Sequence, residues 1–346
     1  MSQDEKYMLR ALELALLGLG SVSPNPMVGC VIVHKDEIIG EGYHEEYGQA
    51  HAEPNAISSL KNPELLPFST VYVTLEPCAH WGKTAPCANL LVEKKVRKVV
   101  IGTVDTNPLV GGKGIQILKD AGIEVVTGVL DKKVREQNKR FFTFMEKKRP
   151  YVILKWAQTK DGFIARENYD SKWISNPYSR QLVHRWRSEE DAIMVGTLTA
   201  KYDNPQLNVR EWVAKNPIRI VVDRKLTLDP GLHLFDQSQS TLCYNQVKTQ
   251  KADNLEHVKL PEGFNIGEIL EDLYERKIQS LIVEGGAQLL NKFIQENLWD
   301  EARVFTGQVQ FGSGIPAPQL NRIQIEDLDI MKDKLIISRN SLNLDI

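Results

Sequence analysis

The sequence predicts a soluble α/β protein built from two domains. At 346 residues, the chain is too long for one ordinary core and suits two domains of roughly 150 to 200 residues each. Apolar, β-rich runs alternate with helical patterns through the first half, which is typical of a sheet with helices on its faces. A short basic run ending in proline, EKKRP (146–150), precedes a new apolar strand. We therefore place the boundary at Lys148 and expect domains over 1–148 and 149–346.

Composition restricts the cellular setting. Hydrophobic residues make up 42% of the chain, charged residues 25%, and the formal net charge is -2, which does not favour binding to nucleic acid. The N-terminal segment carries Asp4 and Glu5 where a signal peptide needs basic residues. No apolar run approaches the ~20 residues of a membrane span, and four cysteines are too few for a disulfide framework. We expect a cytoplasmic protein without a nucleic-acid or membrane partner.

The first half predicts a regular succession of elements. An amphipathic helix over 4–19 ends at Gly20, and a hairpin follows, with its turn at 34–37. Further strands are expected over 69–77, 98–105 and 123–130, and helices beginning near His51, at Cys87 and over 114–122.

Three side chains in this half suit a zinc ion. His51, Cys78 and Cys87 provide one imidazole and two thiolates, which leaves the fourth tetrahedral position for a water, as in a catalytic zinc site. Glu53 lies two residues after the histidine and would act as general acid and base without binding the metal. His-x-Glu followed by Pro-Cys and a second cysteine is the pattern of zinc deaminases. Eight residues separate the two cysteines, however, where that pattern has two.

Other polar residues nearby have more than one interpretation. Cys30 is expected to be a small buried side chain in a strand, not a ligand. Asn25, between two prolines, either serves as an ordinary turn residue or is a polar loop residue that reaches toward the zinc. His80 is either a substitute ligand, a substrate contact or a solvated loop residue.

The second half predicts an α/β domain with a weaker functional signal. Strands are expected over 151–157 and 191–196, and a helix from Pro177 through Trp186 capped by Asn176 or Ser175. VDRKLTL (222–228) and IVEGGAQLL (282–290) suggest two more strands that end in loops. The paired glycines of the latter are either an ordinary turn or a phosphate-binding strand-to-helix turn. Because the GxGxxG fingerprint is missing, a standard Rossmann domain is not indicated.

Longer motifs resemble one known family over nearly the whole chain. They are PNPMVGCVIV, HAEPNAI, TLEPCAHWGKTAPC, VDTNPLVGGKGI and NKRFF in the first half, and TKDG, WIS, VHRWRSEEDAIMVGTLTA, DNPQLNVR and VEGGAQL in the second. This family joins a diaminohydroxyphosphoribosylaminopyrimidine deaminase to an aminouracil phosphoribosyl reductase in riboflavin biosynthesis, and it uses the long cysteine spacing. The resemblance implies a cytidine-deaminase-like three-layer domain followed by a dihydrofolate-reductase-like domain. Pro54, Lys83, Ala85 and Asn204 depart from the family pattern.

The resemblance also implies two reactions and their residues. A zinc-activated water would deaminate a ribosylaminopyrimidinone 5'-phosphate at one Zn²⁺ per chain, and NADPH would then reduce the ribosyl group to ribityl. The substrate site would include Asn25 in the first half and, in the second half, Ser171, Arg187, Leu207, Arg210 and Glu284. NADPH would lie along Gln158, Trp173, Thr199, Asp203 and the loop of Gly285, Gly286, Ala287, Gln288, Leu289 and Leu290. Both arginines suit phosphate because the guanidinium fork matches its oxygens. From residue type alone, Trp173 would be core and Arg187 a helix-surface charge.

Alternative functions make different predictions. A nucleoside or tRNA deaminase with an accessory domain would have short Cys-x-x-Cys spacing and, for tRNA, a basic face. A merely structural zinc would need a fourth protein ligand. The resemblance further implies a homo-oligomer, a dimer or tetramer, and we expect edge strands within 302–346 that pair between subunits.

Overall fold

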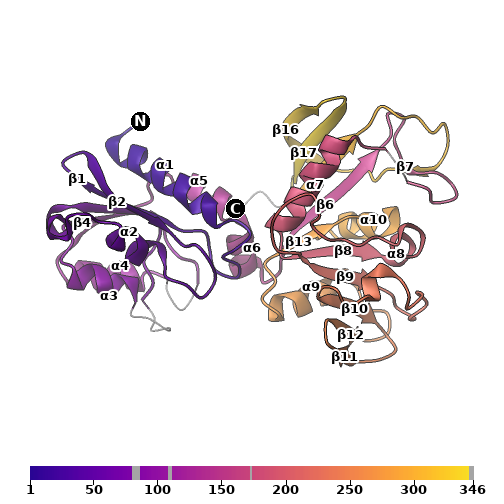
Figure 1. Ribbon diagram of the computed structural model, residues 1–346, viewed down its shortest axis with the longest axis horizontal. Coiled ribbons are helices and arrows are strands. Elements are labelled where there is room, and N and C mark those ends of the chain that lie inside the picture. Colours follow the sequence, from indigo (N-terminus) through magenta and orange to yellow (C-terminus); the bar gives the residue numbers. More distant parts are fainter. Residues whose placement is uncertain (80–85, 108–110, 172–173, 343–346) are drawn as a thin grey trace. The chain divides into compact units, whose positions relative to one another are not determined.

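The computed structural model describes residues 1–79, 86–107, 111–171 and 174–342. The chain divides into two compact units, one over Met1–Lys148 and one that begins at Arg149. Each unit has its own sheet, and the two are described separately (Figure 1).

The first unit is built on a five-stranded sheet in the order β2-β1-β3-β4-β5. The hairpin β1–β2 and the pair β1–β3 are antiparallel, whereas β3, β4 and β5 run parallel. The strands are β1 Gly29–His34, β2 Glu37–Tyr43, β3 Thr70–Leu75, β4 Lys98–Thr103 and β5 Glu124–Thr127. The α-helices are α1 Gln3–Ala15, α2 Ala52–Ser58, α3 Cys87–Glu93, α4 Lys113–Asp120, α5 Asp131–Gln137 and α6 Lys139–Lys147.

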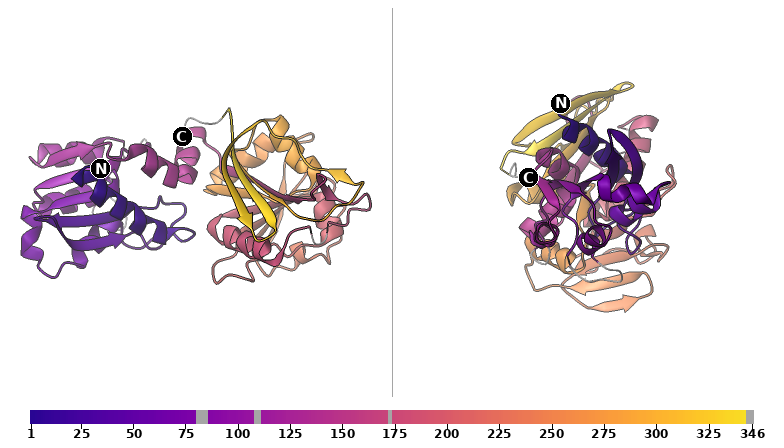
Figure 2. Two further views of the ribbon diagram at one scale, coloured as in Figure 1. Left: turned by 90° about the horizontal axis from the view of Figure 1, so that it is seen from above. Right: turned by 90° about the vertical axis from the view of Figure 1, so that its left-hand side faces the viewer.

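Alternation along the strands sends side chains to two cores, one on each face of this sheet. On one face, Ile32 and Val73 pack with residues of α2, α3 and α4. On the other face, Val31 and Val100 pack against Tyr7 of α1. The result is a three-layer unit with the sheet in the middle (Figures 1 and 2).

The elements predicted for the first half are confirmed with small changes of length. The first helix ends at Ala15 and continues as a 3-10 turn through Gly18. Its start is fixed by a capping box between Ser2 and Glu5, which satisfies two otherwise unpaired N–H groups.

The second unit is built on a ten-stranded sheet in the order β11-β12-β10-β9-β8-β13-β6-β14-β17-β16. All neighbours from β12 to β14 are parallel, and the pairs at the two ends are antiparallel. These strands are β6 Tyr151–Gln158, β8 Ala192–Gly196, β9 Ile218–Val222, β10 Thr241–Asn245, β11 Gln250–Ala252, β12 Leu255–Lys259, β13 Ser280–Val283, β14 Glu301–Thr306, β16 Arg322–Ile330 and β17 Asp333–Asn340, with β7 Phe163–Ala165 and β15 Ile315–Pro316 forming a separate pair. The α-helices are α7 Pro177–Glu189, α8 Thr197–Asp203, α9 Ile266–Glu275 and α10 Ala287–Gln295.

Helices cover both faces of this sheet. Residues of α9 and α10 pack in one core with Val152, Leu154 and Val304. Phe305 is adjacent to Val304 in β14 and so faces the other way, where its ring contacts Trp186 of α7 at 5.5 Å between centroids. The parallel strands therefore present their carboxyl ends along one rim, where open α/β sheets bind ligands.

One expectation for this half is wrong, and a second holds only in part. Residues 222–228 do not form a strand; β9 ends at Val222, and Asp223 then accepts hydrogen bonds from Thr227 and Leu228 to close a turn. Edge strands were expected within 302–346, but β14 lies inside the ten-stranded sheet, between β6 and β17. From the same segment, β16 does form one edge of that sheet, and most of its residues are exposed.

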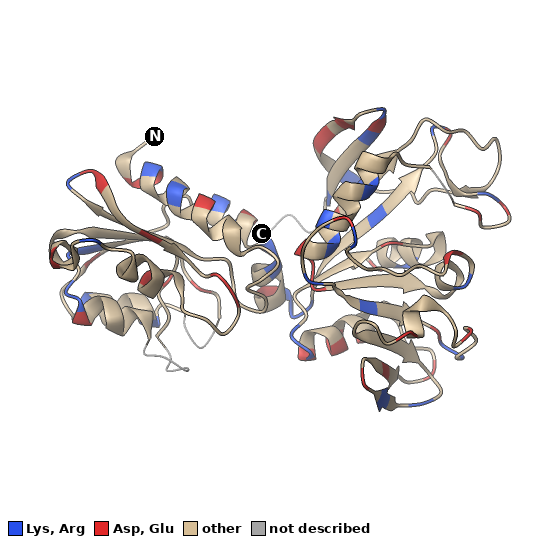
Figure 3. Ribbon diagram, viewed as in Figure 1, with Lys and Arg blue, Asp and Glu red and all other residues tan. Residues whose placement is uncertain are grey.

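Charged residues of both signs are interspersed along the elements of each unit (Figure 3). Within the described ranges, no helix has the length and apolar character needed to cross a membrane.

Candidate active sites

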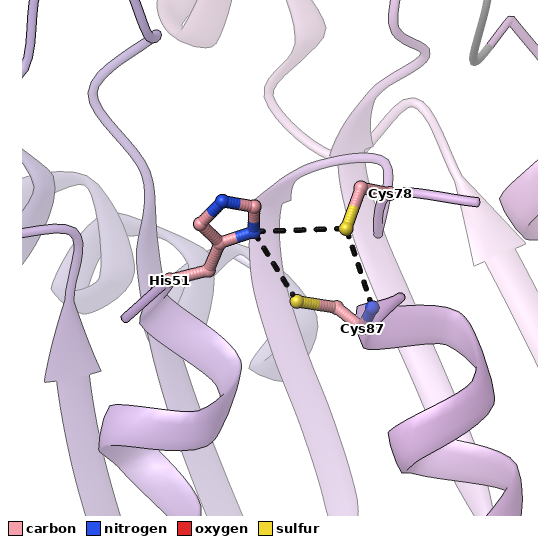
Figure 4. A group of neighbouring side chains, drawn as sticks. All are labelled: His51, Cys78 and Cys87. Atoms are coloured by element: carbon pink, nitrogen blue, oxygen red, sulfur yellow. Dashed lines mark hydrogen bonds between the residues drawn. The ribbon is translucent and has the colours of Figure 1, made fainter. Parts of the chain in front are cut away.

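The first unit brings together the three predicted metal ligands, and each comes from the end of an element. His51 is the N-cap residue of α2, Cys78 follows β3, and Cys87 is the first residue of α3. His51 Nδ1 lies 3.6 Å from Cys78 Sγ and 3.4 Å from Cys87 Sγ (Figure 4). The three donor atoms all lie within 4.8 Å of one another.

This donor set fits zinc. Two thiols and one imidazole nitrogen are the ligands that zinc prefers, and three protein ligands leave one position open. The backbone N–H of Cys87 donates to Cys78 Sγ at 3.3 Å. Hydrogen bonds from the side chains of Cys87 and His51 lower the pKa of the Cys78 thiol, toward the thiolate that binds a metal.

Glu53 lies beside this cluster, in the first turn of α2, and only 3% of it is exposed. Burial raises the pKa of its carboxyl, and the charge of Cys78 raises it further. The neighbouring His51 acts in the opposite direction but does not outweigh them. The carboxyl is thus poised to exchange a proton next to the three metal ligands.

Asn25 is tied to the same cluster through a residue that the sequence analysis missed. Its Nδ2 lies 3.0 Å from Nε2 of His44, whose Nδ1 lies 2.9 Å from the Ala50 carbonyl oxygen. The buried His44 ring also makes an edge contact with the His51 ring. His44 could have been found from its place in the sequence, because it lies at the end of a predicted strand and shortly before HAEPNA (51–56). His80, Lys83 and Ala85 lie outside the described residues.

The second unit holds a cavity of about 770 Å³ at the carboxyl ends of β6, β8, β9 and β13. Most of the predicted residues line it: Ser171, Arg187, Thr199, Asp203, Leu207, Arg210 and 284–290. Gln158 does not; it accepts a hydrogen bond from Trp156 Nε1 at 3.0 Å. Trp173 lies outside the described residues. A cavity of this volume is typical of sites that enclose a drug-sized ligand or a cofactor.

A buried ion cluster marks one wall of the cavity. The guanidinium of Arg187 donates to both carboxylate oxygens of Glu284, each at 2.8 Å, so Arg187 is not a helix-surface charge. Lys155 Nζ lies 3.6 Å from the same carboxylate. Burial raises the pKa of Glu284, but Arg187 and Lys155 outweigh it and hold the pKa at about 2. Glu284 is therefore ionised at neutral pH.

Two proton-carrying side chains of this wall were missed in the sequence. Lys155 interrupts the apolar strand β6, and burial lowers the pKa of its ammonium group. His184 lines the cavity from α7, and burial lowers its pKa as well. The signal for Lys155 was a charged residue within the run YVILKWA.

The strand-to-helix turn after β13 forms another part of the wall. Gly285 has a φ of 110°, in the region that favours glycine, and a Cβ on Gly286 would lie 3.0 Å from Thr199 Oγ1. The two glycines thus let the backbone approach α8 closely while α10 begins at Ala287. The first residues of α10 therefore line the cavity, and the first N–H groups of a helix have no partner within it.

Comparisons with known proteins agree with both sites. Residues 1–103 match the cytidine and deoxycytidylate deaminase zinc-binding region, and residues 150–334 match the RibD C-terminal domain. The fold and the sites thus define a bifunctional enzyme, a zinc deaminase joined to an NADPH-dependent reductase. The chain is 39% identical to the riboflavin biosynthesis protein RibD of Aquifex aeolicus, over 96% of this chain and 95% of the relative. It is 40% identical to RibD of Bacillus amyloliquefaciens, over 95% and 90%. The chain belongs to the RibD family of riboflavin biosynthesis proteins.

Solved structures show the same two-part fold. The diaminohydroxyphosphoribosylaminopyrimidine deaminase/5-amino-6-(5-phosphoribosylamino)uracil reductase of Thermotoga maritima superimposes with a TM-score of 0.89 at 36% identity, covering 97% of this chain and 98% of that one. RibD of Acinetobacter baumannii gives the same TM-score at 35% identity, with the same coverage. The cytidine-deaminase-like domain and the dihydrofolate-reductase-like domain expected from the sequence are confirmed, as are zinc and NADPH as cofactors of the family.

Proposed function

We propose that the unit ending at Lys148 deaminates 2,5-diamino-6-(5-phosphoribosylamino)pyrimidin-4-one. The second unit then reduces the ribosyl group of 5-amino-6-(5-phosphoribosylamino)uracil to ribityl. The observation that carries the proposal is the convergence of His51, Cys78 and Cys87 beside the buried Glu53. The name of the Thermotoga protein, which covers both activities, supports it.

In the deamination, His51, Cys78 and Cys87 hold the metal. Zinc, when bound, supplies Lewis-acid activation of a water molecule. Glu53 would take a proton from that water and pass it to the departing ammonia, a role that fits a buried carboxyl whose pKa is raised. Asn25, held by His44, orients the pyrimidine through its amide.

In the reduction, the cavity walls orient two ligands. NADPH, when bound, would supply the hydride and lie along Thr199, Asp203 and the turn from Gly285 to Leu290. Arg210, which is exposed and donates to Asn208, binds the substrate phosphate. Ser171 and Leu207 line the sugar, and the ion pair of Arg187 and Glu284 binds its hydroxyl groups. Lys155 supplies a proton at this wall, because its ammonium pKa is lowered.

The surroundings of the protein follow from the same proposal. We infer a cytoplasmic enzyme of small phosphorylated substrates that does not bind nucleic acid, since charges of both signs are interspersed over its elements. The exposed edge strand β16 supports pairing with a second copy as a homo-oligomer, a dimer or tetramer.

The test is a coupled assay on the purified protein with the diaminopyrimidinone ribotide. Ammonia release is followed with and without NADPH, together with zinc content. The proposal expects about one zinc per chain, ammonia release without NADPH, and NADPH oxidation only after deamination. It would be overturned by absence of ammonia from zinc-loaded protein, or by absence of NADPH oxidation when deaminated substrate is supplied.

A further inference from the structure

A buried carboxylate in the first unit has no part in the proposed reaction. Glu76 directly follows β3, two residues before Cys78, and only 3% of it is exposed. Its two oxygens accept hydrogen bonds from four backbone N–H groups, two that precede α4 and two in the first turn of α4. The donors are Asp105 at 3.3 Å and Gly112 at 3.0 Å to Oε2, and Gly114 at 2.9 Å and Ile115 at 3.2 Å to Oε1.

These bonds explain how a carboxylate is tolerated in the interior. Removing an ionised group from water is costly unless charge-assisted hydrogen bonds replace the water. Gly114 and Ile115 belong to the first turn of α4, where N–H groups lack partners within the helix and the dipole favours a negative charge. Glu76 therefore fastens the start of α4 to the segment that leads into Cys78.

A second observation places α4 against the same segment. A Cβ added to Gly114 would lie 2.0 Å from the carbonyl oxygen of Pro77, much closer than any side-chain carbon can approach. The backbone of α4 thus packs directly on the residue between Glu76 and Cys78. No larger residue at 114 permits this approach without moving α4 or Pro77.

Cys78 is consequently held from two sides. From α3, the Cys87 N–H donates to its Sγ at 3.3 Å and the Ala88 N–H donates to its carbonyl oxygen at 3.2 Å. From α4, the contacts pass through Glu76 and Pro77. We propose that Glu76 is a positioning residue of the metal centre, which fixes the turn bearing Cys78 by binding the start of α4. The inference rests on the proposed zinc ligands and adds a residue outside them.

The substitution Glu76→Gln tests this with almost no change of volume. A glutamine has one acceptor oxygen, so its amide group must face two of the four N–H donors, donor against donor. Residues that hold metal ligands in place typically contribute 10- to 100-fold to metal affinity. We therefore expect E76Q to release zinc to a colorimetric chelator about 10- to 100-fold faster than the wild type.

Two further variants make the test specific. Gly114→Ala leaves the carboxylate intact but separates α4 from Pro77, and should also release zinc faster. Val100→Ala removes a fully buried side chain from the opposite face of the sheet, so it lowers the stability of the same unit without touching α4. It should release zinc at nearly the wild-type rate, measured well below the unfolding transition of every variant. Reductase activity of the second unit should be unchanged in all three.

The results separate this inference from the proposed function. The role of Glu76 would be overturned if E76Q and G114A released zinc at the wild-type rate, or if V100A released zinc as fast as they do. The zinc site itself would stand in either case. A wild-type protein that retains no zinc would overturn both.

Discussion

The ion pair of Arg187 and Glu284 should make a large contribution to the stability of the second unit. The folded protein holds the pKa of Glu284 at about 2, against 4.5 for a free carboxyl. At 1.36 kcal/mol per pKa unit, this difference corresponds to about 3 kcal/mol of stability at neutral pH. Because the folded-state pKa is depressed, this stability is fully present above pH 4.5 and is lost as the pH falls toward about 2.

Arg187→Met removes the partner that lowers this pKa most and leaves Lys155 at 3.6 Å. We expect a loss of about 3 to 5 kcal/mol at pH 7, because a buried carboxylate is left partly unpaired. Glu284→Gln should also destabilise, whereas the double variant should lose much less than the sum of the two. The gap in unfolding free energy between wild type and R187M should narrow as the pH falls below 4.5, because Glu284 becomes protonated first in the variant and only near pH 2 in the wild type.

Urea unfolding followed by tryptophan fluorescence measures these energies, since five of the six tryptophans lie after Lys148 and report on the second unit. Single losses that add within about 0.5 kcal/mol in the double variant would show that the two side chains do not interact. A gap between wild type and R187M that stays constant from pH 7 to pH 3 would refute the assigned ionisation of Glu284.

Three further outcomes are expected. Glu53→Gln should lower the deaminase kcat by about 10²- to 10⁴-fold, while zinc content and NADPH oxidation with supplied deaminated substrate stay unchanged; loss of zinc in this variant would contradict a role limited to proton transfer. Removal of zinc by a chelator should stop ammonia release while the reduction of deaminated substrate continues, and added zinc should restore deamination. Asn138→Ala should destabilise the first unit by about 2 to 4 kcal/mol in calorimetry, because the buried amide bonds both the N–H and the carbonyl of Met27 at 2.8 and 3.0 Å. A change below about 0.5 kcal/mol would contradict the last expectation.

The clustering of the three candidate metal ligands could be predicted because short-range patterns determine their positions. His51, Cys78 and Cys87 each lie where an apolar strand or a loop gives way to a helix, and such junctions are visible in sequence. Residue type then indicates the metal, and the nearby Glu53 indicates the chemistry.

The residues that were missed depend on long-range packing. Lys155 meets Glu284 only because β6 pairs with β13, a neighbour relation that the order of elements along the chain does not reveal. Arg187 was expected in the substrate site from the resemblance, but its pairing with Glu284 spans 97 residues of sequence and could not be seen from residue type. The interior position of β14 was missed for the same reason. The sequence of an apolar strand does not show whether the strand lies at the edge of a sheet or inside it.

The two sites draw on different stretches of the chain, and this difference affects when each can form during protein synthesis. All donors to the metal lie between His51 and Cys87, within a unit that ends at Lys148. The reductase cavity draws on residues from Lys155 to Ile315. Domains fold as units, with the N-terminal one first as the chain leaves the ribosome. The nascent polypeptide can therefore acquire its zinc and complete its first catalytic centre while the ribosome is still translating the codons for the second.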